Sequence, residues 1–178
     1  MRLTAFLILS CFLAVTGGCG YTSVSLLPSE LDSIHVENFT NKIDPARQVS
    51  DKRASYSYWP GLETDITNAV INQFVLDKNL DVKSESKAAL LLKGSLTDFR
   101  QYPLSYSGEN VEEFRVEVFV DMELYNNLTG ELMWKEAHFM GESTYTISGP
   151  NAKTESQAVH AAVKDLAPRI VERTVDVW

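Results

Sequence analysis

Cysteine is scarce in this sequence, which has only Cys11 and Cys19 among its 178 residues. A disulfide framework needs several cysteine pairs, and a thiolate metal site needs two to four sulfurs. The sequence therefore excludes a disulfide-rich scaffold. It also argues against a sulfur-based metal centre, because we expect Cys11 to leave with a signal peptide and Cys19 to carry lipid. Apolar burial has to hold the fold together, and a chain of this length buries roughly 70% of its unfolded surface.

Positive charge is also in short supply, with 16 Lys+Arg residues against 24 Asp+Glu residues and a net charge of −8. Proteins that bind nucleic acid need a basic face that meets the phosphates. The balance argues against a nucleic-acid partner and against a broad contact with anionic lipid headgroups. Any anionic ligand would have to be met by a local group of cations.

Catalytic signatures are missing as well. The sequence has no Gly-x-Ser-x-Gly elbow, no P-loop, no dinucleotide-binding Gly-x-Gly-x-x-Gly and no His-Glu-x-x-His. His35, His138 and His160 lie far apart along the chain, each within a predicted regular element. We therefore expect no enzyme activity, no cofactor and no metal site.

The only long apolar run is Leu3–Val15, which follows Arg2 and precedes Thr16-Gly17-Gly18-Cys19. It is too short for a membrane span, which takes about 20 residues, and it fits a secretory signal. Small residues before a cysteine resemble a bacterial lipobox. We expect a signal peptide over 1–18, fatty acylation (palmitate-type chains) at Cys19, and a tether over 19–31; an ordinary cleaved signal is the alternative.

Four segments have the composition of strands. The clearest is 113–124, where six apolar residues at period two, from Phe114 to Leu124, alternate with a mainly charged set. Shorter patterns predict strands over 33–39, 88–102 and 132–145, with a turn region over 103–110 and a turn over 126–130.

Two segments have helical periodicity. After Pro60, expected as an early helical residue, an apolar stripe from Leu62 to Phe74 predicts a helix ending near Asp77. Thr154 and Gln157 have the spacing of a capping box and begin a second stripe. Pro168 lies inside that stripe and is expected to kink or break the helix.

The predicted order is β-α-β-β-β-α. Two helices can cover one face of a four-stranded sheet, so the sequence predicts an α+β fold, a two-layer sandwich with a mixed sheet, over 32–178 as one domain. The other face of the sheet would be charged and face solvent or a polar partner.

One segment is locally basic. Residues 42–53 hold Lys42, Arg47, Lys52 and Arg53 against two aspartates, and Tyr56, Tyr58 and Trp59 follow. Long segments without regular structure are often functional, and this composition suits a phosphorylated amphiphile or a protein partner. A solvated connector whose aromatic residues pack under the first helix explains the same pattern.

Taken together, the residues resemble the LptE family of lipopolysaccharide-assembly lipoproteins over essentially all of the chain after the signal. The segments that carry the resemblance are Cys19–Tyr21, Leu27–Pro28, Ile34–Val36 with Phe39 and Asn41, Leu62–Ala69, Ala89–Gly94, and Ala161, Leu166 and Ile170–Glu172.

The resemblance implies a non-enzymatic role. Family members sit at the periplasmic side of the outer membrane and partly inside the β-barrel translocon LptD, which they help to assemble and plug, and they bind lipopolysaccharide. Gly20 after the cysteine agrees with outer-membrane sorting by resemblance to other lipoproteins.

One family feature is replaced here. Members can carry a cation at the tip of the hairpin between the second and third strands, where lipid A phosphates are met, but Ser105–Asn110 has none. Lys153, at the start of the second helix, is the better candidate, since a helix N-terminus favours anions.

Two other functions stay open at this point: a periplasm-facing lipoprotein that binds or shuttles another lipid, and a structural subunit of another envelope complex.

Overall fold

The computed structural model describes residue 28 and residues 30–43 and 59–175. Its elements are β1 (Ser33–Val36), β2 (Thr40–Asn41), α2 (Leu62–Asp77), β3 (Asp81–Val82), the short 3₁₀ helix η2 (Glu85–Lys87), β4 (Leu90–Ser107), β5 (Asn110–Asn126), β6 (Glu131–Thr146) and α3 (Glu155–Val175). The expected α+β fold with a mixed sheet and two helices is confirmed.

The sheet has six strands instead of the four expected. Its order is β3-β1-β4-β5-β6, and β2 pairs with β4 beside this path. β1 lies between β3 and β4 and is parallel to both, and β2 is parallel to β4. β4, β5 and β6 form two antiparallel hairpins. The sequence missed β2 and β3 because two residues are too few to display a period.

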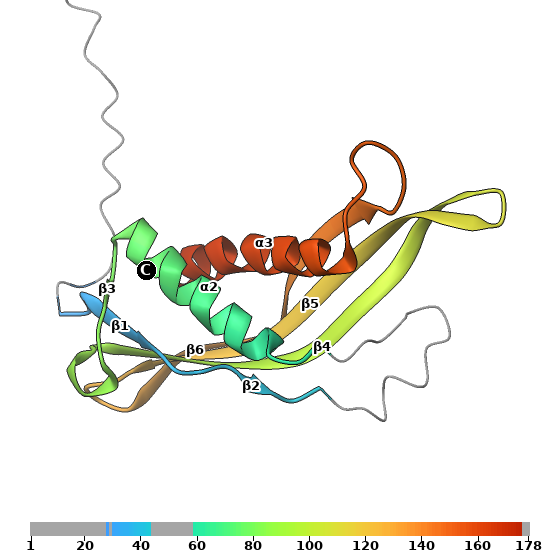
Figure 1. Cartoon of the computed structure of the whole chain (residues 1–178). Coiled ribbons are helices and arrows are strands. Elements are labelled where there is room, and N and C mark those ends of the chain that lie inside the picture. Colours follow the sequence, from blue (N-terminus) through green and yellow to red (C-terminus); the bar gives the residue numbers. More distant parts are fainter. Residues whose placement is uncertain (1–27, 29, 44–58, 176–178) are drawn as a thin grey trace, which may run out of the picture.

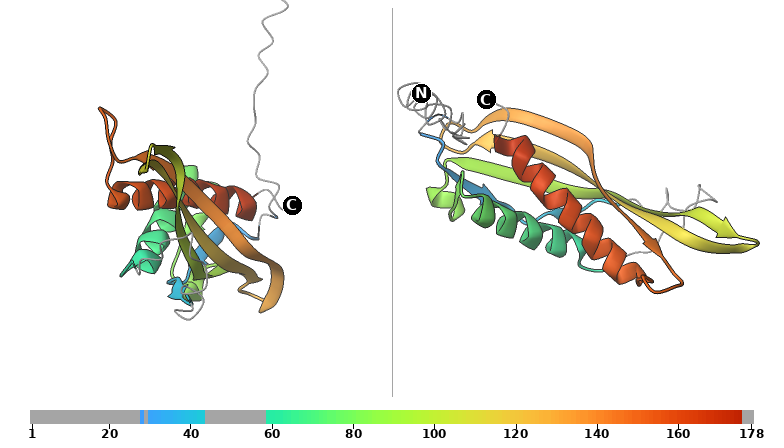
Figure 2. Two further views of the ribbon diagram at one scale, coloured as in Figure 1. Left: turned by 90° about the vertical axis from the view of Figure 1, so that its right-hand side faces the viewer. Right: turned by 90° about the horizontal axis from the view of Figure 1, so that it is seen from above.

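Both helices lie on one side of the sheet, so the fold has the two layers that the sequence predicted (Figures 1 and 2). The period-two apolar set of β5 faces the helices, with Val116, Val118, Val120, Met122 and Leu124 all at 1% exposure or less. α2 contributes Leu62, Ile66, Val70 and Phe74 to the same core.

The helix boundaries differ from expectation at two prolines. Pro60 lies in the turn before α2, which begins at Leu62. Pro168 does not break α3, which runs unbroken from Glu155 to Val175. Pro168 is exposed, so the carbonyl that loses its helical N–H partner can be hydrated. The predicted capping box is confirmed: the Thr154 N–H donates to Gln157 Oε1 (2.9 Å), and the Gln157 N–H donates to Thr154 Oγ1 (3.2 Å).

The expected turn region over 103–110 is wrong for most of its length. β4 continues to Ser107 and β5 begins at Asn110, so only two residues separate the strands. The hairpin of β4 and β5 projects beyond both helices (Figure 1). Among the described residues, β2 pairs with β4 only as far as Leu96 and no strand lies beside Pro103 on that edge, so its missing N–H breaks no ladder bond between described strands.

Two glycines allow close packing on the core side. A Cβ at Gly94 would meet three ring carbons of Phe39 at 2.1–2.4 Å, and a Cβ at Gly141 would meet Ala162 O and Leu166 Cβ at 2.6 Å. Gly94 therefore lets Phe39 lie flat over β4, and Gly141 lets α3 approach the backbone of β6.

Candidate functional site

The face of the sheet opposite the helices, called the open face below, carries polar side chains. They alternate with core residues: Lys93 stands between Leu92 and Gly94 on β4, and Glu123 stands between Met122 and Leu124 on β5. The charged outer face that the sequence predicted for 113–124 is therefore present and is not covered by either helix (Figure 2).

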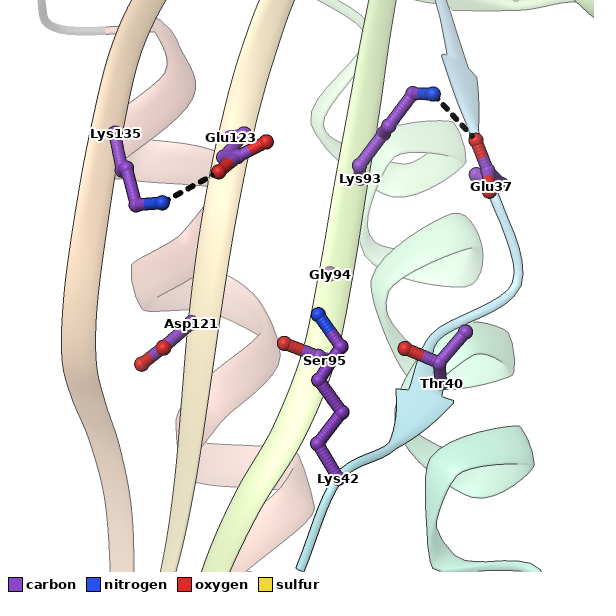
Figure 3. Close-up of a pocket in the computed structure, with 9 residues that line it drawn as sticks. All are labelled: Glu37, Thr40, Lys42, Lys93, Gly94, Ser95, Asp121, Glu123 and Lys135. Carbon is purple, nitrogen blue, oxygen red and sulfur yellow. Dashed lines mark hydrogen bonds and ion pairs between the residues drawn. The ribbon is translucent and has the colours of Figure 1, made fainter.

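A polar hollow of about 310 Å³ lies on the open face. It draws residues from β2, β4, β5 and β6 and from the chain on either side of β2 (Figure 3). Its lining residues are Glu37, Thr40, Lys42, Lys93, Gly94, Ser95, Asp121, Glu123 and Lys135. The hollow thus brings three ammonium groups, three carboxylates and two hydroxyls together.

Two of the three lysines are held in ion pairs across neighbouring segments. Lys135 Nζ lies 2.7 Å from Glu123 Oε1, and Lys93 Nζ lies 3.4 Å from Glu37 Oε2. Glu123 also accepts a 2.7 Å hydrogen bond from the Tyr125 hydroxyl. The Lys135 hydrogen bond, followed by that of Tyr125, lowers the pKa of the Glu123 carboxyl below its ordinary value.

Lys42 supplies the third cation. Its side chain reaches from the end of β2 toward Ser95, on the side of the hollow that also holds Thr40 (Figure 3). Among the residues that the structure describes, Lys42 has no carboxylate within the 4.0 Å of an ion pair, although its charge contributes to the lowered pKa of Glu123. Lys42 is therefore the cation of the hollow that is free to meet a ligand.

A second hollow, of about 220 Å³, adjoins the first and shares Lys42 and Asp121 with it. The Asp121 carboxylate accepts a 2.9 Å hydrogen bond from the main-chain N–H of His138. His138 has a left-handed φ of 56° and lies at the β-bulge where the register between β5 and β6 shifts. Arg100 pairs with Asp98 at 2.7 Å and lies over the ring of Phe119. The two hollows lie next to each other on the open face and are together called the polar groove below.

Farther along the same face, the Tyr102 hydroxyl donates a hydrogen bond to Glu117, which is only 7% exposed. Burial, and then this hydrogen bond to the carboxylate, raise the pKa of Tyr102 above its ordinary value. Tyr102 therefore stays a phenol donor that satisfies the buried carboxylate, which is a structural role.

Of the predicted site residues, only Lys42 and Lys153 lie in the described part of the chain, and they share neither hollow. Lys42 lines both hollows. Lys153 is exposed in the loop before α3, where its N–H donates to Thr146 O (2.9 Å), and it lines neither hollow. Cys19, Arg47, Lys52 and Arg53 lie outside the described residues.

Sequence reasoning missed Lys93 and Lys135. The available signal was their place on the outer face of β4 and β6, next to the charged set of β5. The register was not available: Lys93 and Lys135 both stand opposite Glu123 on the neighbouring strands. That pairing depends on β-bulges in the β4–β5 and β5–β6 ladders, which no sequence pattern predicted.

Within residues 28, 30–43 and 59–175, no three His, Cys, Asp or Glu side chains gather closely enough to hold a metal ion. No helix in the same ranges is long and apolar enough to cross a membrane.

Several solved structures have a similar fold at low sequence identity. The hypothetical protein CT253 from Chlamydia trachomatis has a TM-score of 0.50 and 7% identity, over 80% of this chain and 94% of that one. A putative lipoprotein from Caulobacter crescentus has a TM-score of 0.47 and 15% identity, over 84% and 92%. The minor lipoprotein from Acinetobacter baumannii has a TM-score of 0.46 and 9% identity, over 82% and 94%. At these identities the likeness concerns the fold alone.

No curated protein matches the sequence. A family model does match: LptE, described as lipopolysaccharide-assembly, covers residues 31–174, from two residues before β1 to the next-to-last residue of α3. The resemblance of the sequence to this family is thereby confirmed. The chain belongs to the LptE lipopolysaccharide-assembly family.

Proposed function

We propose that this protein is a non-enzymatic outer-membrane lipoprotein, acylated at Cys19, that partners and plugs an LptD-like β-barrel during lipopolysaccharide assembly. The observation that carries the proposal is the family match over residues 31–174, on a fold in which α2 and α3 leave the polar face of the sheet uncovered (Figure 2).

The open face has the chemistry that a barrel lumen would accept. Barrel interiors are polar and hydrated. The charges of the 310 Å³ hollow are balanced and mostly paired, as in Lys135–Glu123 and Lys93–Glu37. The open face would therefore be repelled neither by a positively charged nor by a negatively charged barrel wall. Its ion-paired side chains keep about a third to a half of their exposure, and they can exchange water for wall contacts at small cost.

Docking through the open face is tested by charge reversal. A Lys93→Glu/Lys135→Glu variant sets like charges against Glu37 and Glu123, whereas Lys164→Glu changes an exposed residue of α3 as the matched control. Tagged proteins are recovered from detergent extracts, and copurifying proteins are identified by mass spectrometry. We expect wild type and Lys164→Glu to recover a large β-barrel and the double variant to lose it.

The contrary results are equally definite. Recovery of inner-membrane transporter components in place of a barrel would support a lipid shuttle. Equal barrel recovery by a correctly folded double variant would refute docking through the open face. Normal surface lipopolysaccharide and a fully assembled barrel after depletion of the protein would refute the function as a whole.

Acylation is tested directly by mass spectrometry of the mature N-terminus. We expect two or more acyl chains on Cys19, because one chain at about 0.8 kcal/mol per CH₂ holds a protein only marginally. Cys19→Ala should release the protein from the membrane fraction. An unmodified wild-type N-terminus would contradict the proposal.

Lipopolysaccharide contact is assigned to the basic segment of 42–53 and to Lys153. The four cations of the segment are Lys42, Arg47, Lys52 and Arg53. Their combined replacement by alanine should weaken binding of lipopolysaccharide, and Lys153→Ala should do so to a lesser degree, whereas exposed Lys87 serves as the matched control. Equal binding by all variants would remove these residues from the site.

A further inference from the structure

Four large apolar side chains are exposed near one end of the sheet. Val75 and Leu76 lie in the last turn of α2 and are 56% and 72% exposed. Leu128 lies in the turn between β5 and β6 and is 69% exposed, and Leu132, just after that turn, is 46% exposed. Leu76 and Leu128 are the most exposed of the large apolar residues that the structure describes.

Backbone hydrogen bonds place these residues at the same end as the start of β1. The Asp81 N–H donates to Asp32 O (2.9 Å), which joins the segment after α2 to the residue before β1. The Asn127 N–H donates to Ala89 O (2.8 Å), which joins the β5–β6 turn to the start of β4. Figures 1 and 2 show the end of α2 and the β5–β6 turn at this end of the sheet.

We infer that this end rests on a phospholipid bilayer and inserts Leu76 and Leu128 into its surface. The inference rests on the proposed acylation of Cys19. Nine residue steps separate Cys19 from Pro28, and an extended chain of that length reaches at most about 30 Å. The acylated cysteine therefore holds this end, and no other, within reach of the membrane.

The charge of this end selects the kind of lipid. The described segments that form this end, 30–33, 77–87 and 127–132, carry six carboxylates (Glu30, Asp32, Asp77, Asp81, Glu85 and Glu131) and three lysines (Lys78, Lys83 and Lys87). Lys83 is shared between Asp32 at 3.6 Å and Asp81 at 3.9 Å. An acidic surplus disfavours anionic headgroups, so the contact is apolar insertion into a bilayer of zwitterionic lipid and should be insensitive to salt.

The opposite end provides matched controls. Tyr106 and Ile147 are 59% and 50% exposed and lie near the tip of the β4–β5 hairpin and just after β6. Sixteen residue steps along β4 separate Tyr106 from Leu90, a length of about 50 Å. These side chains are about as exposed as Val75 and Leu132, but the tether does not bring them to the bilayer.

The test uses nitroxide labels on the mature, acylated chain in phosphatidylcholine–phosphatidylethanolamine vesicles. Cys19 is consumed by lipid, so Leu76→Cys, Leu128→Cys and Ile147→Cys each offer one thiol. Oxygen concentrates in the apolar part of a bilayer, whereas a water-soluble nickel complex stays in water. The relative relaxation of the nitroxide by the two reagents therefore reports how deep the label lies in the bilayer. We expect labels at 76 and 128 to favour oxygen and the label at 147 to favour nickel. Nickel preference at all three positions would overturn the inference.

Two further measurements separate the possible failures. Mass spectrometry of the same sample establishes acylation: labels in water on an acylated, vesicle-bound chain overturn this contact alone, whereas a chain without acyl groups also refutes the proposed function. A third outcome is that the labels at 76 and 128 become shielded from both reagents, but only when the LptD-like barrel is added. That result would show that this end contacts the barrel protein and not the bilayer, and it would overturn the inference.

A second readout needs no label. Leu76→Ser/Leu128→Ser changes two exposed side chains and should fold normally, as circular dichroism can check. It should lower partitioning of the chain into zwitterionic vesicles by at least about tenfold, with no weakening between low and high salt. Unchanged partitioning would contradict apolar insertion.

Discussion

Phe39 and Gly94 depend on each other, and a double-mutant cycle can measure the dependence. Phe39 is 3% exposed and its ring covers the α-carbon of Gly94, where a Cβ would lie 2.1–2.4 Å from three ring carbons. No side chain fits in that space, so Gly94→Ala must displace the ring. The ring cannot simply slide along β4, because the Phe39 N–H is bound to Thr67 Oγ1 at 2.9 Å.

The loss of unfolding free energy caused by Gly94→Ala therefore lies between the cost of overpacking a core and the cost of losing a buried phenylalanine. Overpacking a core costs about 1–3 kcal/mol, and complete loss of a buried phenylalanine costs about 3–5 kcal/mol. Phe39→Ala alone should lower the free energy of unfolding by about 3–5 kcal/mol. In that background a methyl group at 94 enters vacated space, and alanine is preferred over glycine in a strand by about 0.5–1 kcal/mol.

The double variant should consequently be no less stable than Phe39→Ala alone. Urea unfolding followed by circular dichroism gives the four free energies of the cycle. The coupling energy should be at least as large as the whole cost of Gly94→Ala. Additive costs, agreeing within about 0.5 kcal/mol, would refute the packing of Phe39 on Gly94.

Three more predictions concern other parts of the fold. Gly141→Ala should lower the free energy of unfolding by about 1–3 kcal/mol, because its Cβ would press on the backbone carbonyl of Ala162 at 2.6 Å; an unchanged urea midpoint would contradict this close approach. Pro168→Ala should raise stability by about 1–3 kcal/mol by restoring one hydrogen bond inside α3, and a fall in melting temperature would show that the proline is needed. Lys135 lowers the pKa of Glu123, so this pair stabilises the fold above the ordinary pKa of 4.5 and loses that effect as pH falls through the lower folded value. The stability difference between wild type and Glu123→Gln, below about 1 kcal/mol for an exposed pair, should therefore shrink between pH 6 and pH 3, and a difference that grows would have the wrong sign.

The long, regular elements could be predicted because burial imposes a period on them. β5 shows this most clearly: its residues from Val116 to Leu124 alternate between the core and the open face, and the sequence alternates with them. α2 was placed for the same reason, since Leu62, Ile66, Val70 and Phe74 occupy one stripe and are all fully buried.

The features that were missed depend on partners distant in the sequence. β2 and β3 have two residues each and exist only because β4 and β1 offer them an edge. Pro103 is tolerated in β4 because no strand of the described residues pairs with that edge beyond Leu96, which only the topology reveals.

The candidate site was predicted in part. Lys42 was identified from local charge, and it does line the polar groove. The contributions of Lys93 and Lys135 could not be predicted, because their approach to Glu37 and Glu123 follows from strand register and not from spacing along the chain.

The proposed docking of the open face in a β-barrel is tested most directly by photocrosslinking in living cells. A benzoylphenylalanine in place of Lys93 lies on the open face, and one in place of Lys164 lies on the exposed side of α3. The account predicts that the residue at 93 captures a large outer-membrane β-barrel, identified by mass spectrometry. Capture of no barrel at 93, in cells that assemble the barrel and surface lipopolysaccharide normally, would contradict it.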